Sequence, residues 1–319
     1  MDVPDAADRA EAVLQTIHGA VIADDEFLRT VLTGVLADGH VLLEDVPGTG
    51  KTLTARTLAT ALGLEFSRVQ FTPDLLPADV TGTHIFNEGA GSFEFSEGPI
   101  FANVVLADEI NRAPPKTQAA LLEAMEEGQV TVDGDTHALP DPFFVIATQN
   151  PVEQEGTFPL PEAQVDRFMI KSSLGYPDDA GEVELLRRRA GRTEQSPSVE
   201  SVLEQESVRT VREVPETVRV DDDLLEYIAT LARETREQPE VRVGVSPRGT
   251  QRLFEAARAR ATIEGSEIVT PDHIAAVARP VLAHRLVLTP EATVDEVDKT
   301  AIVDRLLDSV PVPTIDRAV

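Results

Sequence analysis

The segment that most constrains the fold of this chain is residues 40–62, in which an apolar run, a glycine-rich turn and a helix-forming stretch follow one another. Residues 40–44 read His-Val-Leu-Leu-Glu, a pattern typical of a short buried strand. The turn at 47–52 reads Pro-Gly-Thr-Gly-Lys-Thr and leads into a helix through Leu62. Because strand, turn and helix in this order begin a βαβ unit, the segment predicts an α/β fold with a parallel sheet.

Three further apolar runs, at 66–71, 104–107 and 143–147, strengthen this prediction. Each run is rich in β-branched or aromatic residues, as the buried strands of parallel sheets are. Each run also ends at a polar residue, and in parallel sheets the ligand-binding side chains gather at the carboxyl ends of the strands. We therefore expect an αβα sandwich with a candidate site along that edge of the sheet.

Two irregular stretches interrupt the strand and helix pattern. Residues 72–102 contain four glycines around an alternating Ser-Phe-Glu-Phe at 92–95, which indicates a hairpin within an insert. Residues 129–138 contain the Asp-Gly pair that is typical of a two-stranded hairpin. We therefore expect one insert and one hairpin beside the sheet.

The character of the sequence changes near residues 173–177. Upstream of this point, helices are expected at 6–18 and 25–37. Downstream, no strand pattern of comparable strength appears, and the expected helical segments are 178–190, 198–212, 221–236, 249–263, 271–283 and 294–309. The chain is therefore predicted to hold an α/β core at 1–175 and a smaller all-helical domain at 176–319.

The turn at 45–52 nearly matches the pattern G-x-x-x-x-G-K-[ST] of a phosphate-binding loop. Glycines let successive backbone N–H groups point at phosphate oxygens, and the start of the following helix adds positive potential. Lys51 can reach the β- and γ-phosphates, and the hydroxyl of Thr52 can bind Mg²⁺. Asp45 replaces the first glycine of the pattern and brings a carboxylate close to the phosphates. The residues expected to contact a nucleotide are Asp45, Val46, Pro47, Gly48, Thr49, Gly50, Lys51, Thr52 and Leu53.

Two carboxylates, Asp108 and Glu109, follow the apolar run at 104–107. Asp108 can hold Mg²⁺ through the water shell of the ion, and Glu109 can polarise an attacking water as a general base. The alternative is a strand that simply ends at a solvated acidic pair. Asp108 lies 57 positions after Lys51, behind one intervening strand, and this placement favours a nucleotide site.

Three more residues are candidates for contact with a nucleotide. Asn150 follows the run at 143–147 and can position a water or sense the γ-phosphate; the alternative is a capping asparagine. Arg167 follows a short predicted helix and Arg248 opens another, and in isolation each is typical of an ion-pair partner. They are candidates for catalysis because phosphoryl transfer needs cations that neutralise the charge of the transition state.

Together these residues resemble the AAA+ ATPases, and four longer motifs resemble the MoxR family in particular. They are Phe-Thr-Pro-Asp-Leu-Leu-Pro at 71–77, Gly-Pro-Ile-Phe-Ala at 98–102, Asp-Glu-Ile-Asn-Arg-Ala-Pro at 108–114 and Leu-Pro-Glu-Ala-Gln-Val-Asp-Arg-Phe at 160–168. The resemblance covers about residues 6–285. It implies a P-loop NTPase core with an insert before Walker B and a hairpin before sensor 1, followed by a helical lid.

The resemblance also implies roles. Lys51 and Thr52 match Walker A, and Asp108 and Glu109 match Walker B. Sensor 1 is matched by Asn150. The arginine finger, which acts on the nucleotide of the adjacent subunit, is matched by Arg167, and sensor 2, which reaches from the lid to the γ-phosphate, by Arg248. Such a shared active site implies a homo-oligomeric ring, expected to be a hexamer, that uses ATP and Mg²⁺. The family usually has Val-Gly-Gln where this chain reads Ile-Ala-Asp at 22–24, so the adenine contacts stay open.

The charge of the chain restricts its partners. Acidic residues number 56 against 28 Lys and Arg, which gives a net charge of −28, and only four of the cations are Lys. This composition resembles proteins of salt-loving microbes such as halophilic archaea, in which salt screens the self-repulsion of an acidic surface. The stretches 69–111 and 117–166 contain no Lys or Arg, so neither expected hairpin offers cations to the phosphates of a nucleic acid.

We therefore expect an ATP-driven, chaperone-like remodeller. The resemblance implies that it assists maturation of, or metal insertion into, a partner complex, beside a protein with a von Willebrand A domain; the client is not identified. A nucleic-acid motor is the first alternative, which the uncharged or acidic hairpins disfavour. A nucleotide-binding scaffold without hydrolysis is the second, which the presence of Glu109 and Asn150 disfavours. No signal peptide or membrane-spanning run is visible, so we expect a cytoplasmic protein without membrane insertion.

Overall fold

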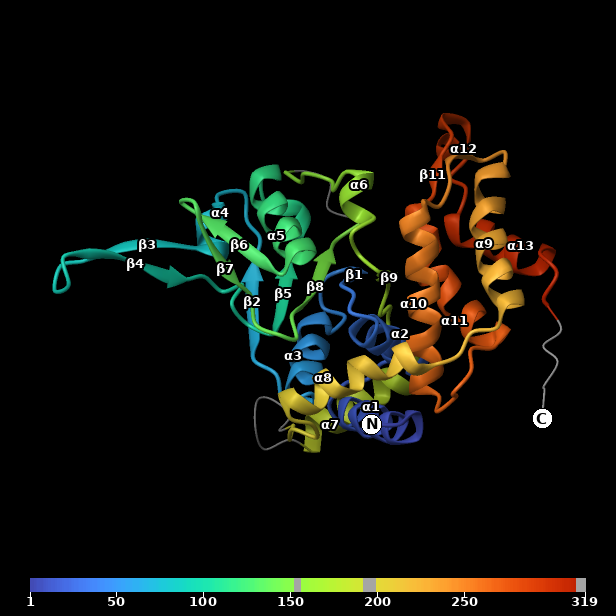
Figure 1. Cartoon of the computed structure of the whole chain (residues 1–319), viewed down its shortest axis with the longest axis horizontal. Helices are drawn as coiled ribbons and strands as arrows, with labels where there is room; N and C mark the ends of the chain where they lie inside the picture. The colour runs from blue at the N-terminus through green and yellow to red at the C-terminus, as the bar shows by residue number, and fades with distance from the viewer. Residues whose placement is uncertain (152–155, 192–198, 314–319) are drawn as a thin grey trace.

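The computed structural model describes residues 1–151, 156–191 and 199–313, and a five-stranded parallel sheet lies at its centre (Figure 1). The strands are β1 (Val41–Glu44), β2 (Phe66–Gln70), β5 (Val104–Asp108), β8 (Phe144–Gln149) and β9 (Ile170–Ser172). They lie in the order β2-β5-β8-β1-β9, and every neighbouring pair is parallel. Four of them confirm predicted strands. The sequence pattern does not predict β9, because a run of three residues is too short to show a period.

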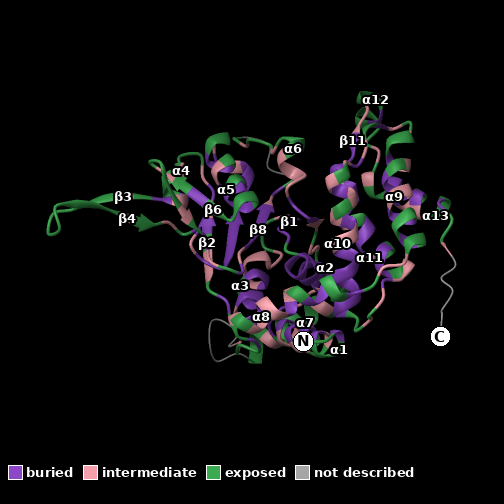
Figure 2. Cartoon of the chain, viewed as in Figure 1, coloured by how far each residue is buried: buried purple, intermediate pink, exposed green. Residues whose placement is uncertain are grey.

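Both faces of this sheet are buried, as the near-continuous apolar runs of its strands predict (Figure 2). Leu43 and Leu106 point to a first core, and their chain neighbours Leu42 and Val105 point to a second core on the opposite face. The helices that contribute to these cores are α1 (Val3–Ala20), α2 (Asp25–Leu36) and α3 (Lys51–Ala61) in the first and α5 (Pro115–Glu127) in the second. The predicted N-terminal helices are thus confirmed.

Both predicted hairpins are also present. The insert at 72–102 contains a short helix and a hairpin, and the second hairpin follows α5; their elements are α4 (Pro77–Thr81), β3 (Gly82–Asn87), β4 (Ser92–Glu97), β6 (Gln129–Val132) and β7 (Asp135–Ala138). The β3–β4 hairpin projects far from the sheet in Figure 1. The turn of the β6–β7 hairpin has a positive φ at both Asp133 and Gly134, as its Asp-Gly sequence predicts.

The segment after β9 first returns to the core. It contains α7 (Asp179–Gly191) and α8 (Gln205–Glu213), and these helices lie near α1 and α3 in Figure 1. The guanidinium of Arg188 donates to the carbonyl oxygen of His18 over 2.8 Å, and the N–H of Leu203 donates to the carbonyl oxygen of Ala61 over 3.1 Å. The helix predicted at 198–212 begins later, at Gln205, and residue 198 lies outside the described residues.

The remaining elements form a helical lid. Its helices are α9 (Asp222–Glu237), α10 (Pro247–Ile263), α11 (Pro271–Leu282), α12 (Pro290–Val294) and α13 (Lys299–Ser309). Three-residue or four-residue 3-10 helices, η2 (Val214–Thr217) and η3 (Ala283–Arg285), and a ribbon of β10 (Val241–Val243) and β11 (Val287–Leu288) complete it. The sequence pattern misses this ribbon, because each of its strands is only two or three residues long. No helix in the described part of the chain has the length and apolarity needed to span a membrane.

The lid shares a hydrophobic core with one face of the sheet. Leu253 of α10 and Ile274 of α11 belong to the same apolar cluster as Val31 and Leu32 of α2. In Figure 1, α10 runs beside α2. The lid is therefore docked through buried side chains on the face of the sheet that α1, α2 and α3 cover.

The backbone at Gly39 passes very close to the side chain of Met169, in the segment that enters β9. Gly39, between α2 and β1, lies so near Met169 that a Cβ atom at position 39 would be 2.5 Å from the Cβ and 2.6 Å from the sulfur of Met169. Met169 is fully buried, and its N–H donates to the carbonyl oxygen of His40 over 2.9 Å. Only glycine fits at position 39 without displacing this segment.

We predict that Gly39→Ala lowers the free energy of unfolding by about 1–3 kcal/mol, because the added methyl group overpacks a buried contact. Gly19→Ala is the matched control: nothing lies within 4 Å of its Cβ position near the end of α1, and alanine is the better helix former. This control should gain about 0.5–1 kcal/mol. Denaturant unfolding of the two variants in one buffer makes the comparison, and equal shifts would contradict the close approach.

Candidate nucleotide-binding site

The loop between β1 and α3 has the geometry of a phosphate cradle. Gly48 and Gly50 adopt φ values of +90° and +101°, which favour glycine, and α3 starts at Lys51 directly after them. The ammonium of Lys51 donates to the carbonyl oxygens of Asp45 and Val46 over 2.9 and 2.8 Å. Burial lowers the pKa of Lys51, while nearby carboxylates oppose this shift. The side chain thus folds back over the loop, where it could reach the oxygens of a bound phosphate group.

Asp45, which replaces the first glycine of the loop pattern, has a structural role that the sequence does not reveal. Its carboxylate is engaged by the segment after β9: it accepts hydrogen bonds from the hydroxyl of Ser173 over 2.6 Å and from the N–H groups of Leu174 and Gly175 over 2.8 and 2.9 Å. Asp45 is 5% exposed. The carboxylate of Asp45 thus binds the chain that leads from β9 to α7, and its predicted position near the phosphates stays a prediction.

Asp108 ends β5 at the same edge of the sheet, and its carboxylate is paired with the guanidinium of Arg68. The guanidinium of Arg68 donates twice to one carboxylate oxygen, over 3.0 and 2.7 Å, and the hydroxyl of Thr148 donates to the other over 2.6 Å. Because a cation is seated on this carboxylate, the residues fit a metal ion that would take the place of Arg68. Among the described residues no group of three or more His, Cys, Asp or Glu side chains could hold a metal. Mg²⁺ is usually held by one or two carboxylates together with waters and phosphate oxygens.

Glu109 is held in a left-handed backbone conformation with a φ of +58°. Its N–H donates to the hydroxyl of Thr148 over 2.8 Å, and its carboxylate accepts from the side-chain amide of Gln70 over 2.7 Å. Arg112 forms an ion pair with the same carboxylate oxygen at 3.2 Å. The strained residue is thus fixed from three directions, as functional residues in rare backbone conformations are.

Asn150 follows β8 and is buried beside the phosphate loop. The N–H of Asp45 donates to the carbonyl oxygen of Gln149 over 3.1 Å, so the chain leaves β8 next to the start of the loop. The sequence pattern does not mark Arg68, Gln70 and Thr148 as parts of this site. A usable signal was present, because Gln70 and Thr148 are also polar residues near the carboxyl ends of predicted strands.

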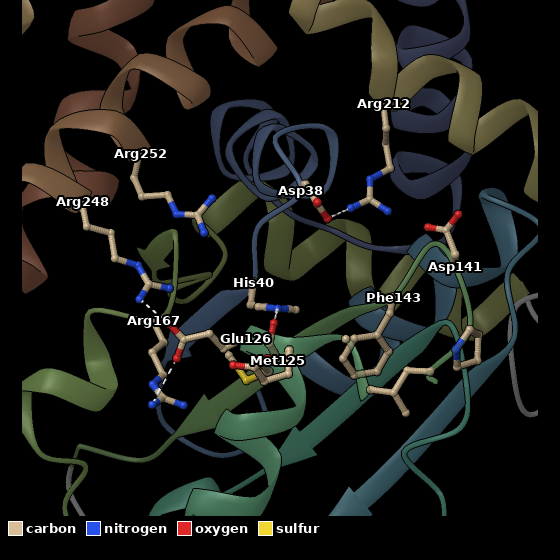
Figure 3. Close-up of a pocket in the computed structure, with 14 residues that line it drawn as sticks. Asp38, His40, Met125, Glu126, Asp141, Phe143, Arg167, Arg212, Arg248 and Arg252 are labelled. Carbon is tan, nitrogen blue, oxygen red and sulfur yellow. Dashed lines mark hydrogen bonds and ion pairs between the residues drawn. The ribbon is translucent and has the colours of Figure 1, made fainter. Parts of the chain in front are cut away.

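Arg167 and Arg248 lie together at the opposite edge of the sheet, in a cavity of about 390 Å³ (Figure 3). Both guanidinium groups contact the carboxylate of Glu126, Arg167 at 3.1 Å and Arg248 at 2.8 Å. His40 also lines the cavity and directly precedes β1, whereas the phosphate loop directly follows β1. The structure therefore places neither arginine beside Lys51 of the same chain.

Comparison with known proteins identifies the family. Residues 40–170 match the ATPase family associated with various cellular activities (AAA), and residues 233–306 match the AAA lid domain. The chain is 50% identical to YeaC of Bacillus subtilis over 96% of this chain and 95% of that protein. It is 40% identical to the chaperone MoxR1 of Mycobacterium tuberculosis over 96% of this chain and 83% of that protein. An ATPase candidate from Cytophaga hutchinsonii has a similar crystal structure, with a TM-score of 0.91 and 39% identity over 98% of this chain and 97% of that one.

The chain belongs to the MoxR family of AAA+ ATPases. Its α/β core and helical lid are the AAA+ fold that the resemblance predicts. The core match of this MoxR chain includes the phosphate loop, the Asp108–Glu109 pair, Asn150 and Arg167, and the lid match includes Arg248.

We predict that Asp45→Asn loosens the segment at 173–175. An asparagine has one acceptor oxygen where aspartate has two, so a backbone N–H of this segment would face an amide donor, at a cost of about 1–3 kcal/mol. The N–H groups of Leu174 and Gly175, which donate to Asp45, should then exchange their hydrogens faster in this variant. Hydrogen exchange followed by mass spectrometry of the peptide that covers 173–175 measures this. The exposed lid variant Asp295→Asn is the control, and equal exchange of this peptide in the two variants would contradict the tether.

Proposed function

We propose that this MoxR-family chain is a Mg²⁺-dependent ATPase that works as a ring. The observation that carries the proposal is the division of the site between two edges of one sheet. Lys51, Asp108 and Glu109 lie at the carboxyl edge, while Arg167 and Arg248 lie at the amino edge. A head-to-tail arrangement of subunits would bring the arginines of one chain to the phosphate loop of the next.

At the carboxyl edge, the position of each residue supports a role in ATP binding or hydrolysis. The N–H groups of the loop and the ammonium of Lys51, which now donates to carbonyl oxygens, would bind the β- and γ-phosphates of ATP. Thr52 and Asp108 would hold Mg²⁺, which when bound neutralises charge on the phosphates. Glu109 would take a proton from the attacking water as general base, and Asn150 would orient that water.

At the amino edge, Arg167 would act as the arginine finger and Arg248 as sensor 2. Since both guanidinium groups meet at Glu126, we propose that both act on the nucleotide of the neighbouring subunit. This changes the expectation for Arg248, whose γ-phosphate contact would be made between chains. Cations that approach the γ-phosphate only after assembly would make hydrolysis depend on the ring, expected to be a hexamer.

The proposed output is chaperone-like remodelling of a client protein. A relative at 40% identity is named a chaperone, which supports this reading. Metal insertion or complex maturation beside a von Willebrand A domain protein, a cytoplasmic location and a salt-rich source stay proposals from the family resemblance and the composition. Both hairpins lack Lys and Arg, and His84 on β3 faces Asp133 at 3.1 Å, so the hairpins offer little positive charge to a nucleic acid.

We predict that Glu109→Gln lowers ATP turnover by about 100-fold or more, because the general base is lost. ATP affinity should stay within about threefold, since the phosphate loop and Lys51 are unchanged. Phosphate release at molar salt and nucleotide titration measure the two quantities. Glu65 is an exposed residue that directly precedes β2, and the control variant Glu65→Gln should keep full turnover. A Glu109 variant that hydrolyses ATP as fast as the wild type would exclude Glu109 as the base.

We predict that Arg167→Ala binds ATP but does not hydrolyse it, and that Glu109→Gln subunits rescue it. In a mixed ring, an Arg167→Ala subunit keeps its own Glu109 and receives Arg167 from its neighbour. An equal mixture of the two variants should regain about a quarter of wild-type turnover if interfaces form at random. Light scattering in ATP and high salt verifies that rings form. Full activity of Arg167→Ala alone, or a persistent monomer, would count against the shared site.

A further inference from the structure

Arg285 is a buried cation that the proposed function does not use. It ends η3 in the lid, and only 1% of its side chain is exposed. Burial lowers its pKa to about 10, and the carboxylate of Asp166 opposes this shift. A buried guanidinium needs partners for its donors, because its desolvation is otherwise unfavourable. The identity of those partners therefore indicates what the side chain does.

Most partners of Arg285 surround Arg167, and its guanidinium also contacts Val281 and His284 of the lid. Its guanidinium donates to the carbonyl oxygens of Asp166, Phe168 and Met169 over 3.2, 2.8 and 3.2 Å. It also forms an ion pair with the carboxylate of Asp166 at 2.8 Å. One lid side chain thus binds the backbone on both sides of the proposed arginine finger.

The segment that carries Arg167 has few local backbone hydrogen bonds before Met169, whose N–H donates to the carbonyl oxygen of His40. It connects α6 (Glu162–Val165), a single turn, to the three-residue strand β9. The N–H groups of Arg167 and Phe168 reach back only to this turn, over 3.2 and 3.1 Å. The carbonyl oxygens that follow the turn depend on donors from elsewhere. Nε2 of His284 lies 3.1 Å from that of Phe168, and Arg285 reaches all three with the planar fork that a lysine lacks.

The same side chain packs against the helix start that carries Arg248. Gly249 follows Arg248 in the first turn of α10, and a Cβ atom at position 249 would lie 2.8 Å from Cδ and 3.2 Å from Nε of Arg285. Glycine at this position lets the stem of Arg285 pass directly beside α10. Arg285 therefore contacts residues next to Arg167 and next to Arg248, the two arginines that meet at Glu126.

We propose that Arg285 is a positioning residue that sets Arg167 of the core and Arg248 of the lid in one fixed arrangement for the nucleotide of the neighbouring subunit. This inference rests on the proposed function, since it requires that both arginines act between chains. Small displacements of such groups are costly, because a misplacement of about 1 Å can reduce a rate by about 100-fold.

The test is Arg285→Gln, which keeps some hydrogen bonding but removes the charge and the fork. Turnover should fall by about 10- to 100-fold, while ATP affinity and ring formation stay at wild-type values. An equal mixture with Glu109→Gln should restore turnover to the level reached by Arg167→Ala in the same mixture. The nucleotide of an Arg285→Gln subunit would then meet intact arginines from its neighbour. If Arg285 only joined the lid to the core within its own chain, the mixture would show no rescue, because the defect would stay within the variant subunit.

Two further variants keep the inference falsifiable. Asp166→Asn removes the ion pair but leaves the carbonyl contacts, so it should give a smaller loss with the same rescue, and it decides the question if Arg285→Gln does not fold. Arg305→Gln is the control, because this lid arginine is half exposed and pairs with Glu240. It should keep full turnover.

The outcomes separate this inference from the proposed function. If Arg167→Ala is rescued by Glu109→Gln while Arg285→Gln and Asp166→Asn are fully active, or inactive without rescue, only the role of Arg285 is overturned. If the wild type does not hydrolyse ATP, or Arg167→Ala retains full activity, the proposed function fails and the role of Arg285 falls with it.

Discussion

The parallel alignment of the five strands decides where each functional group of this chain lies. Because every strand of the sheet runs in the same direction, the loop after β1 and the polar residues after β5 and β8 share one edge. The connections that return to the opposite edge carry the segment of Arg167 and the cavity beside His40. One chain therefore presents the proposed phosphate-binding groups at one edge and Arg167 and Arg248 at the other, and the apolar core shared by sheet and lid keeps these edges in a fixed relation.

The sequence predicts the parts of this arrangement that repeat a local pattern. The four longer strands, the phosphate loop and Asp108 with Glu109 follow from apolar runs that end in polar residues. What could not be predicted depends on contacts between distant segments. The tether of Asp45 to 173–175 spans about 130 positions, and the meeting of Arg248 with Glu126 spans 122. Arg285 and Arg167 are separated by a similar number of positions in the sequence. No periodicity in the sequence indicates such contacts.

The acidity of the chain explains why several cations near the proposed site are paired with carboxylates. The first 172 residues hold 28 acidic and nine basic side chains, so acidic side chains are available as ion-pair partners for each cation. Arg68 pairs with Asp108, Arg112 with Glu109 and Lys171 with Glu44. An incoming nucleotide with its metal would therefore exchange partners: phosphates replace carboxylates or carbonyls on the cations, and the metal replaces a guanidinium on Asp108. Such exchange leaves few charges unpaired before or after binding.

Glu126 shows how this exchange would work at the arginine edge. Two guanidinium groups would repel each other if no anion lay between them, and the carboxylate of Glu126 contacts both. The hydrogen bond from Arg248 lowers the pKa of Glu126. Because the folded pKa lies below its ordinary value, the stabilisation is present at neutral pH and is lost only as the pH falls through that lowered pKa. Protons therefore do not open this bridge near neutrality, whereas a phosphate group, with more charge than a carboxylate, can compete for the same two arginines.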